Sequence, residues 1–300
     1  MMTASIDCPA LPIKKSAVAY SVCMLILPIK TPLLKSGDDL ASILFVSAEF
    51  QPDDIVVVSS KAVATVEGAA IDLSTIMPTA EARELNSMKH KSDAYCQALL
   101  DEMHRMHGTV AGRCPLAILT CLRPDGLPQG ILPIANAGLD VSNVEKGFAI
   151  GWPREPVRSV RILREELLDR MRKQRNHQKE QKSTKISKSS EFSVAVILGD
   201  SFCMPARFGV IALALTVCGI DPFIDNVGRK DLFGNAFSMT REATADQLCT
   251  AANFVMGNTS ECTPAAIIRN HHLSLSEFCG WVPGIEPDED LFRDMFLRPN

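Results

Sequence analysis

Polar side chains that could bind a metal ion and a phosphate follow three of the apolar stretches in the sequence. Asp200 and Ser201 follow VAVILG, Asp140 follows ANAGL, and Ser60 and Lys61 follow IVVVS. Carboxylates that a fold brings together from distant parts of a chain hold hard cations such as Mg²⁺ and Mn²⁺, whose oxygen shell is commonly completed by substrate phosphates. A serine hydroxyl and a lysine ammonium suit the phosphate oxygens themselves. We therefore expect a metal and phosphate site if these strand ends meet.

Each of these residues also has an ordinary structural interpretation. Asp140 precedes Val141-Ser142-Asn143 and could cap a turn, and its spacing alone favours that interpretation. Asp200 could likewise cap a loop. The chain has neither G-x-x-x-x-G-K-[ST] nor G-x-G-x-x-G, which argues against a P-loop and a dinucleotide-binding fold. Periodicity cannot show whether the clusters meet in space.

The composition excludes some classes of function. The chain has 300 residues, of which 46% are hydrophobic and 6% aromatic, and its formal net charge is −4. A near-balanced charge with few aromatic residues gives no reason to expect nucleic-acid binding. The apolar segment KKSAVAYSVCMLILPIK is too short to span a bilayer and lacks a small-residue cleavage site, so a first buried strand is favoured over a signal peptide.

The ten cysteines include no C-x-x-C pair, and most lie in apolar stretches. This usage is typical of reduced, buried thiols and not of a disulfide framework or a zinc site. We therefore expect a cytoplasmic protein with no membrane partner.

The pattern along the chain mixes strands and helices without a strict βαβ repeat, which indicates an α+β fold. SVCMLILPI reads as a central strand, and IVVVSSKAVATVEG as a strand that ends in Ser59-Ser60-Lys61. Helices are expected over 37–50, 79–108, 159–175 and TADQLCTAANFVMG. Further strands are expected in PLAILTCL, GILPIANAGLD, VAVILG and PAAIIR.

A basic segment interrupts the second half of the chain. Between Arg170 and Lys188 there are eight basic residues against one acid, and almost nothing in the segment could be buried. We interpret residues 170–190 as a disordered, solvated insertion, and this interpretation is favoured over a site for an anionic partner.

Several blocks of sequence occur in an order found in one enzyme family. They are PIKTPLLKSGDDL, DDIVVVSSKAV, ANAGLDVSNVEKG, PREPVRSV, VAVILGDSF, ATADQLCTAANFVMGNTSE and EDLFRD. Together they resemble the coenzyme F-420:L-glutamate ligase family from about Leu25 to Arg293. Residues 20–293 would then form one gamma-glutamyl ligase-like domain that contains the basic insertion.

The resemblance implies a mixed α+β fold, with sheets flanked by helices, in an interlocked homodimer. It implies GTP as the nucleotide, Mn²⁺ or Mg²⁺ as the metal, and a small-molecule carboxylate acceptor and L-glutamate as substrates. Because a carboxylate is a poor acyl electrophile, the γ-phosphoryl group would first be transferred to it, and the glutamate amine would then displace phosphate to form the amide. Positioning and charge neutralisation would supply most of the catalysis.

The resemblance also assigns roles to individual residues of this chain. Catalytic roles fall on Asp140, Asp200 and Arg207, and metal contacts on Asp140, Asp200, Ser201 and Asn258. Nucleotide contacts fall on Leu33, Leu34, Ser60, Lys61, Asn143, Gly257, Asn258 and Glu261.

The chain departs from the family pattern at several charged positions. Thr65 and Ala69 stand where the family generally has a lysine and an arginine, and Cys203, Met204 and Ala206 replace a glycine, an arginine and a tryptophan. Losing a charge-assisted hydrogen bond costs about 1.5–3 kcal/mol. Three alternatives therefore stay open: the F-420 ligase, a ligase for another carboxylate acceptor, and a nucleotide-binding or scaffolding protein without catalysis.

Overall fold

A six-stranded mixed sheet forms the centre of the computed structural model, which describes residues 23–86, 91–182 and 193–296. Its strands are β1 (Leu25–Ile29), β12 (Ala265–Arg269), β2 (Asp54–Ser59), β8 (Val194–Cys203), β9 (Val210–Cys218) and β13 (Cys279–Trp281), in that spatial order. β2 and β8 run parallel, and the other neighbours are antiparallel. The expected mixed sheet with flanking helices is confirmed, whereas the interlocked dimer stays a prediction.

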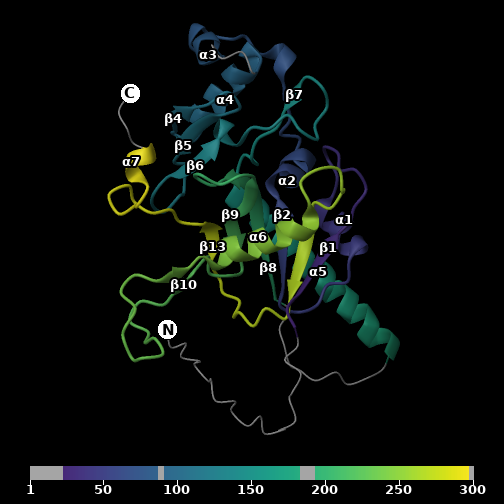
Figure 1. Cartoon of the computed structure of the whole chain (residues 1–300). Coiled ribbons are helices and arrows are strands. Elements are labelled where there is room, and N and C mark those ends of the chain that lie inside the picture. Colours follow the sequence, from purple (N-terminus) through teal and green to yellow (C-terminus); the bar gives the residue numbers. More distant parts are fainter. Residues whose placement is uncertain (1–22, 87–90, 183–192, 297–300) are drawn as a thin grey trace, which may run out of the picture.

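Helices cover both faces of this sheet, which explains the unbroken apolar runs of its inner strands. Successive residues of β2 alternate between two cores: Val56 and Val58 pack with α1 (Leu40–Ser47) and α5 (Pro156–Lys182), while Ile55 and Val57 pack with α6 (Thr244–Met256). In Figure 1, α6 lies across one face of the sheet, and α5 extends towards the lower right.

A smaller group of elements lies beyond one end of the sheet, at the top of Figure 1. It contains α3 (Ala80–Leu85), α4 (Asp93–Arg105), and an antiparallel sheet of β4 (Thr109–Arg113), β5 (Ile118–Leu122) and β6 (Leu132–Ala135). A two-stranded sheet, β3 (Ile71–Asp72) with β7 (Phe148–Ala149), adjoins it. The remaining short elements are α2 (Ser60–Val66), η1 (Leu73–Thr75), η3 (Asn136–Gly138), β10 (Ile224–Asp225), β11 (Arg241–Glu242) and α7 (Arg293–Phe296).

Two expected strands differ in the structure. Among the described strands, β1 comes first and lies at an edge of the sheet and not at its centre, because its one partner there is β12. The strand IVVVSS ends at Ser59, and Ser60 begins the short helix α2. Lys61 and Ser60 therefore lie on the first turn of a helix that follows the strand directly.

The basic segment also differs from the expectation of a disordered loop, since α5 continues to Lys182. The helix has no glycine or proline after Pro156, and its buried apolar stripe extends to Met171. Two basic residues of this segment pair with acids: Arg170 with Asp39, and Lys173 with the carboxylate one turn earlier. Residues 183–192 of the expected insertion lie outside the described residues. Within the described ranges, no helix combines the length and apolar character needed to cross a bilayer.

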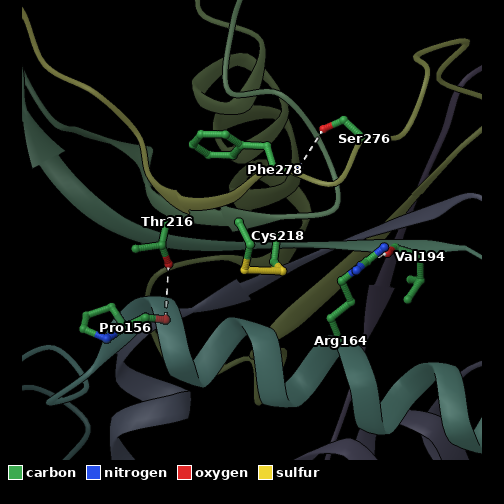
Figure 2. Close-up of a disulfide and its surroundings, with 8 residues drawn as sticks. Pro156, Arg164, Val194, Thr216, Cys218, Ser276 and Phe278 are labelled. Atoms are coloured by element: carbon green, nitrogen blue, oxygen red, sulfur yellow. Dashed lines mark hydrogen bonds between the residues drawn. A yellow bond between two sulfur atoms is a disulfide. The ribbon is translucent and has the colours of Figure 1, made fainter. Parts of the chain in front are cut away.

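One pair of cysteines contradicts the expectation of free thiols throughout. Cys218 of β9 and Cys279 of β13 face each other in the strand register, and the structure joins them in a disulfide (Figure 2). The two residues are 61 positions apart, so only the antiparallel pairing of their strands brings them together. Figure 2 also shows α5 beneath this pair, where the Nε atom of Arg164 donates to the carbonyl of Val194 over 2.8 Å.

Replacing Cys279 with serine should destabilise the protein. A cross-link that closes a long loop typically stabilises a fold by about 2–4 kcal/mol, mainly by restricting the unfolded chain. We expect Cys279→Ser to lower the free energy of unfolding by about that amount, measured by urea denaturation without reductant. Cys114→Ser, which changes an exposed free thiol, is the control. Equal unfolding curves for wild type and Cys279→Ser would show that the disulfide does not form.

Candidate active site

A cavity of about 540 Å³ opens at the edge of the central sheet where β2 and β8 end. These strands are parallel and paired with Ser59 opposite Gly199, so Ser60 and Asp200 emerge from the same edge. Side chains from the turn after β1, the loop after η3 and the loop after α6 complete the wall. The predicted site residues that line the cavity are Leu33, Leu34, Ser60, Lys61, Asp140, Asn143, Asp200, Ser201, Gly257, Asn258 and Glu261.

Arg207 is the predicted site residue that does not line this cavity. It lies on the exposed turn between β8 and β9, where its backbone N–H donates to the carbonyl of Met204 over 3.2 Å. The neighbouring Ala206 has a φ of 55°, which fits a tight turn. The catalytic role of Arg207 stays a prediction.

Lys61 and Asp140, which both line the cavity, form an ion pair. The Nζ atom of Lys61 lies 2.6 Å from Oδ2 of Asp140 and 2.8 Å from the carbonyl oxygen of Ser142. The other carboxylate oxygen of Asp140 accepts the backbone N–H groups of Val141 and Ser142. Asp140 therefore does cap a turn, as the structural interpretation predicted, and it also presents its carboxylate to the cavity.

The pKa of Asp140 is about 2, well below its ordinary value. Burial by itself raises this pKa, but the hydrogen bonds from Lys61 and Ser142 and the charge of Lys61 together outweigh it. Asp140 is consequently ionised across the physiological range.

Asp200 has the opposite environment, because burial raises its pKa. The indole Nε1 of Trp152 donates to Oδ2 of Asp200 over 2.5 Å. Four contributions lower the pKa of Asp200 without reversing the effect of burial: this bond, the Ser201 backbone N–H, the Ser60 hydroxyl and the Lys61 charge. The backbone of β8 packs closely against α6 just before Asp200, since a Cβ at Gly199 would come within 2.2 Å of the Cys249 sulfur.

The loop after α6 closes the opposite wall of the cavity. The side-chain amide of Asn143 donates to the carbonyl of Thr259 over 2.7 Å and so connects this loop to the Asp140 turn. The carboxylate of Glu261 accepts both the backbone N–H and the hydroxyl of Thr259. Gly257, with a φ of 76°, leaves room for that carboxylate, because a Cβ there would come within 2.4 Å of it. Asn258 accepts a hydrogen bond from Asn253 and stays exposed.

The donor set of the cavity suits a hard cation. The carboxylates of Asp140 and Asp200, the hydroxyl of Ser201 and the amide oxygen of Asn258 are all oxygen ligands. In the described part of the chain, no three His, Cys, Asp or Glu side chains form a metal site by themselves. A cation held here would therefore need further oxygens, of the kind that substrate phosphates and water supply.

Three positions that the sequence interpretation missed hold this site in place. Trp152 contacts Asp200, and the Tyr95 hydroxyl donates to the carbonyl of Leu139, next to Asp140, over 2.9 Å. Glu102, which is buried, pairs with Arg154 just after Trp152. A lone aromatic residue in an apolar stretch usually belongs to the core, so the sequence carried no sign that Trp152 and Tyr95 contact the site. The one nearby signal was the PREPVRSV block, which directly follows Trp152.

Comparison with known proteins identifies the group to which this arrangement belongs. The profile of the F420-0:Gamma-glutamyl ligase family matches residues 28–176 and 177–270. The chain belongs to the F420-0:gamma-glutamyl ligase family. It is thus a ligase of the type that forms amide bonds, which confirms the expected kinship.

Curated relatives in the family share about a third of their residues with this chain. The coenzyme F420:L-glutamate ligase of Methanopyrus kandleri is 31% identical over 264 residues, which cover 87% of this chain and 93% of the relative. That of Methanothermobacter thermautotrophicus is 30% identical, covering 87% and 95%. That of Methanosarcina acetivorans is 32% identical over 240 residues, covering 80% and 83%.

The cavity of this family member carries little positive charge. Of the described residues that line it, Lys61 alone is cationic, whereas Asp140, Asp200 and Glu261 are acidic. Thr65, where the resemblance leads one to expect a lysine, donates its hydroxyl to the Lys61 carbonyl over 2.7 Å. The charged side chains of the cavity wall therefore disfavour a bare anionic ligand.

Removing the Lys61 ammonium should raise the pKa of Asp140. In Lys61→Met we expect the pKa of Asp140 to rise above about 2, because the hydrogen bond and the charge of Lys61 are lost while those from Ser142 remain, measured by NMR of labelled aspartate. Lys173→Met, which breaks an exposed pair on α5, should leave this titration unchanged. An unchanged Asp140 titration in Lys61→Met would show that the ion pair does not form.

The sign of the accompanying stability change follows from the lowered pKa. A carboxylate whose pKa is lower in the folded than in the unfolded chain stabilises the fold above the unfolded value and loses that contribution as the pH falls through the folded one. Ionised Asp140 therefore stabilises the wild type at neutral pH, and this contribution disappears as the pH falls from 3.8 towards about 2.

Proposed function

We propose that the protein is a GTP- and divalent-metal-dependent ligase that joins L-glutamate to the carboxylate of F420-0 through an amide bond. The observation that carries this proposal is the charge of the cavity. A nucleoside triphosphate cannot bind among three carboxylates and one ammonium unless bound cations neutralise it. The oxygen donors of the same cavity are the ligands that Mg²⁺ and Mn²⁺ prefer.

The metal would be held by Asp140, Asp200, Ser201 and Asn258. When bound, it neutralises the charge that develops on the triphosphate during phosphoryl transfer. Asp140 is prepared for this role, because its lowered pKa keeps it ionised. The Lys61 ammonium contacts Asp140, and its charge also acts on Asp200. A positive charge between the two carboxylates is therefore already stabilised by this chain.

The chain's own side chains would bind and orient the nucleotide. Ser60 and Lys61 would donate to phosphate oxygens, and Asn143, Gly257 and Glu261 would hold the opposite side through the loop that they stabilise. Leu33, which is 76% exposed, offers an apolar surface at the mouth of the cavity. Neighbouring Leu34 lines the same wall.

The reaction would proceed in two steps. Transfer of the γ-phosphoryl group to the acceptor carboxylate forms an acyl phosphate and releases GDP. The amine of L-glutamate then attacks the acyl carbon, the bond from that carbon to the phosphate oxygen breaks, and inorganic phosphate leaves. Holding the acceptor, the amine and the nucleotide in one cavity supplies the orientation that both steps need.

Cys203 gives a reason to test a carboxylate acceptor other than F420-0. This residue lines the cavity where the resemblance leads one to expect a glycine, and its side chain changes the shape of that wall. A ligase for another acceptor would keep the nucleotide and metal chemistry and differ in the part of the wall that contacts the acceptor. The homodimer that the resemblance implies is part of the same proposal.

Nucleotide binding should require metal and Asp200. By calorimetry we expect GTP to bind wild type only with Mn²⁺ present, with a dissociation constant in the range of roughly micromolar that corresponds to about −8 kcal/mol. Asp200→Ala should weaken this binding at least about tenfold, since it removes a ligand of the cation. Asp169→Ala on the exposed face of α5 is the matched control. Metal-independent GTP binding by wild type would contradict the proposed site.

An assay of product formation distinguishes F420-0 from another carboxylate acceptor. With F420-0, L-glutamate, GTP and Mn²⁺, we expect a product heavier by one glutamyl residue together with GDP and phosphate, detected by mass spectrometry. Metal-dependent GTP binding without this product would favour either the other acceptor or a nucleotide-binding protein without catalysis. Absence of both would contradict the proposed function.

A further inference from the structure

A segment of three residues connects the two carboxylates of the cavity. The backbone of Asp140 pairs with Ile150: the Asp140 N–H donates to the Ile150 carbonyl over 2.8 Å, and the Ile150 N–H donates back over 2.9 Å. Two residues later, the indole of Trp152 donates to Oδ2 of Asp200 over 2.5 Å. The positions of Asp140 and Asp200 are therefore coupled through residues 150–152.

The indole of Trp152 is held tightly where it makes this bond. The residue is 2% exposed, and its ring lies so close to Gly138 that a Cβ there would come within 2.8 Å. The ring of Trp281 packs against it with centroids 6.2 Å apart. The following turn is anchored by Arg154, whose guanidinium lies 2.6 Å from the buried carboxylate of Glu102.

We propose that Trp152 is a positioning residue that orients the Asp200 carboxylate towards the cation. An indole N–H is a donor only, so it holds Oδ2 in one orientation. The carboxylate also accepts from the Ser201 backbone N–H and the Ser60 hydroxyl, and its remaining lone pairs would bind the cation. Trp152 does not itself line the cavity. This inference rests on the proposed function, because it assigns Trp152 a role in the metal site proposed there.

Side chains that hydrogen-bond a metal ligand, as Trp152 does Asp200, contribute measurably to metal affinity. A side chain that hydrogen-bonds a metal ligand typically accounts for about 10–100-fold in affinity. The effect of removing the indole N–H should therefore appear in cation binding before it appears in nucleotide contacts.

The direct test is calorimetry of Mn²⁺ binding to Trp152→Phe in the presence of GTP. This change keeps an aromatic ring and removes the N–H, and we expect the metal to bind about 10–100-fold more weakly than to wild type. Trp281→Phe is the matched control, because it keeps an aromatic ring beside Trp152 and removes an indole N–H that donates to the backbone carbonyl of Asp125 and not to a carboxylate of the site. Trp281→Phe should bind Mn²⁺ as wild type does.

The outcomes separate this inference from the function on which it rests. If wild type binds Mn²⁺ and Trp152→Phe binds it equally well, the positioning role is overturned while the proposed function stands. If wild type itself does not bind Mn²⁺, the proposed function fails and the inference fails with it. In an Asp200→Asn background, Trp152→Phe should have little further effect, whereas a merely structural role would weaken binding in both backgrounds.

A second measurement covers the case in which Trp152→Phe does not fold. The chain has two tryptophans, so Trp152 is the sole tryptophan in Trp281→Phe. Titration of this folded variant with Mg²⁺ and GTP should change the indole emission with the same midpoint as the calorimetric curve. Unchanged emission in a variant that binds Mg²⁺ would overturn the proposal.

Discussion

The parallel pairing of β2 with β8 is the constraint on which the rest of the site depends. Two parallel neighbours end at the same edge of a sheet, and here one delivers Ser60 and Lys61 while the other delivers Asp200 and Ser201. Helices on both faces bury Asp54–Val58 of β2 and Val194–Gly199 of β8, so the register cannot slip without exposing one of the two cores. The smaller group of elements then adds Asp140, which its bridge to Ile150 holds in place.

Charge explains how this edge becomes a binding site. Lys61 lies between two carboxylates with opposite pKa displacements: it helps to keep Asp140 ionised, and its charge only partly offsets the burial of Asp200. A cavity with this charge repels a bare triphosphate, which is why the proposed nucleotide would bind together with divalent cations. The same cations would neutralise the charge of the triphosphate during the phosphoryl transfer proposed for this ligase.

Much of this arrangement could be predicted from the sequence, but not the contacts between its parts. The apolar runs before Ser60 and Asp200 indicated buried strands, yet nothing in them showed that the two strands are adjacent and parallel. The helical α5 was underestimated because a run of charges resembles a solvated loop, while its apolar stripe up to Met171 continues the helix. Trp152 and the pair Cys218–Cys279 were missed for one reason: each contact joins residues far apart in the chain.

The most direct test of the central claim is a crystal structure of the protein with Mn²⁺ and a non-hydrolysable GTP analogue, recorded at the manganese absorption edge. The account predicts an anomalous peak bonded to oxygens of Asp140 and Asp200, with the phosphates of the analogue completing the shell and Lys61 moved onto a phosphate oxygen. A nucleotide bound in another part of the molecule, or an intact Lys61–Asp140 pair with no manganese at the two carboxylates, would contradict it.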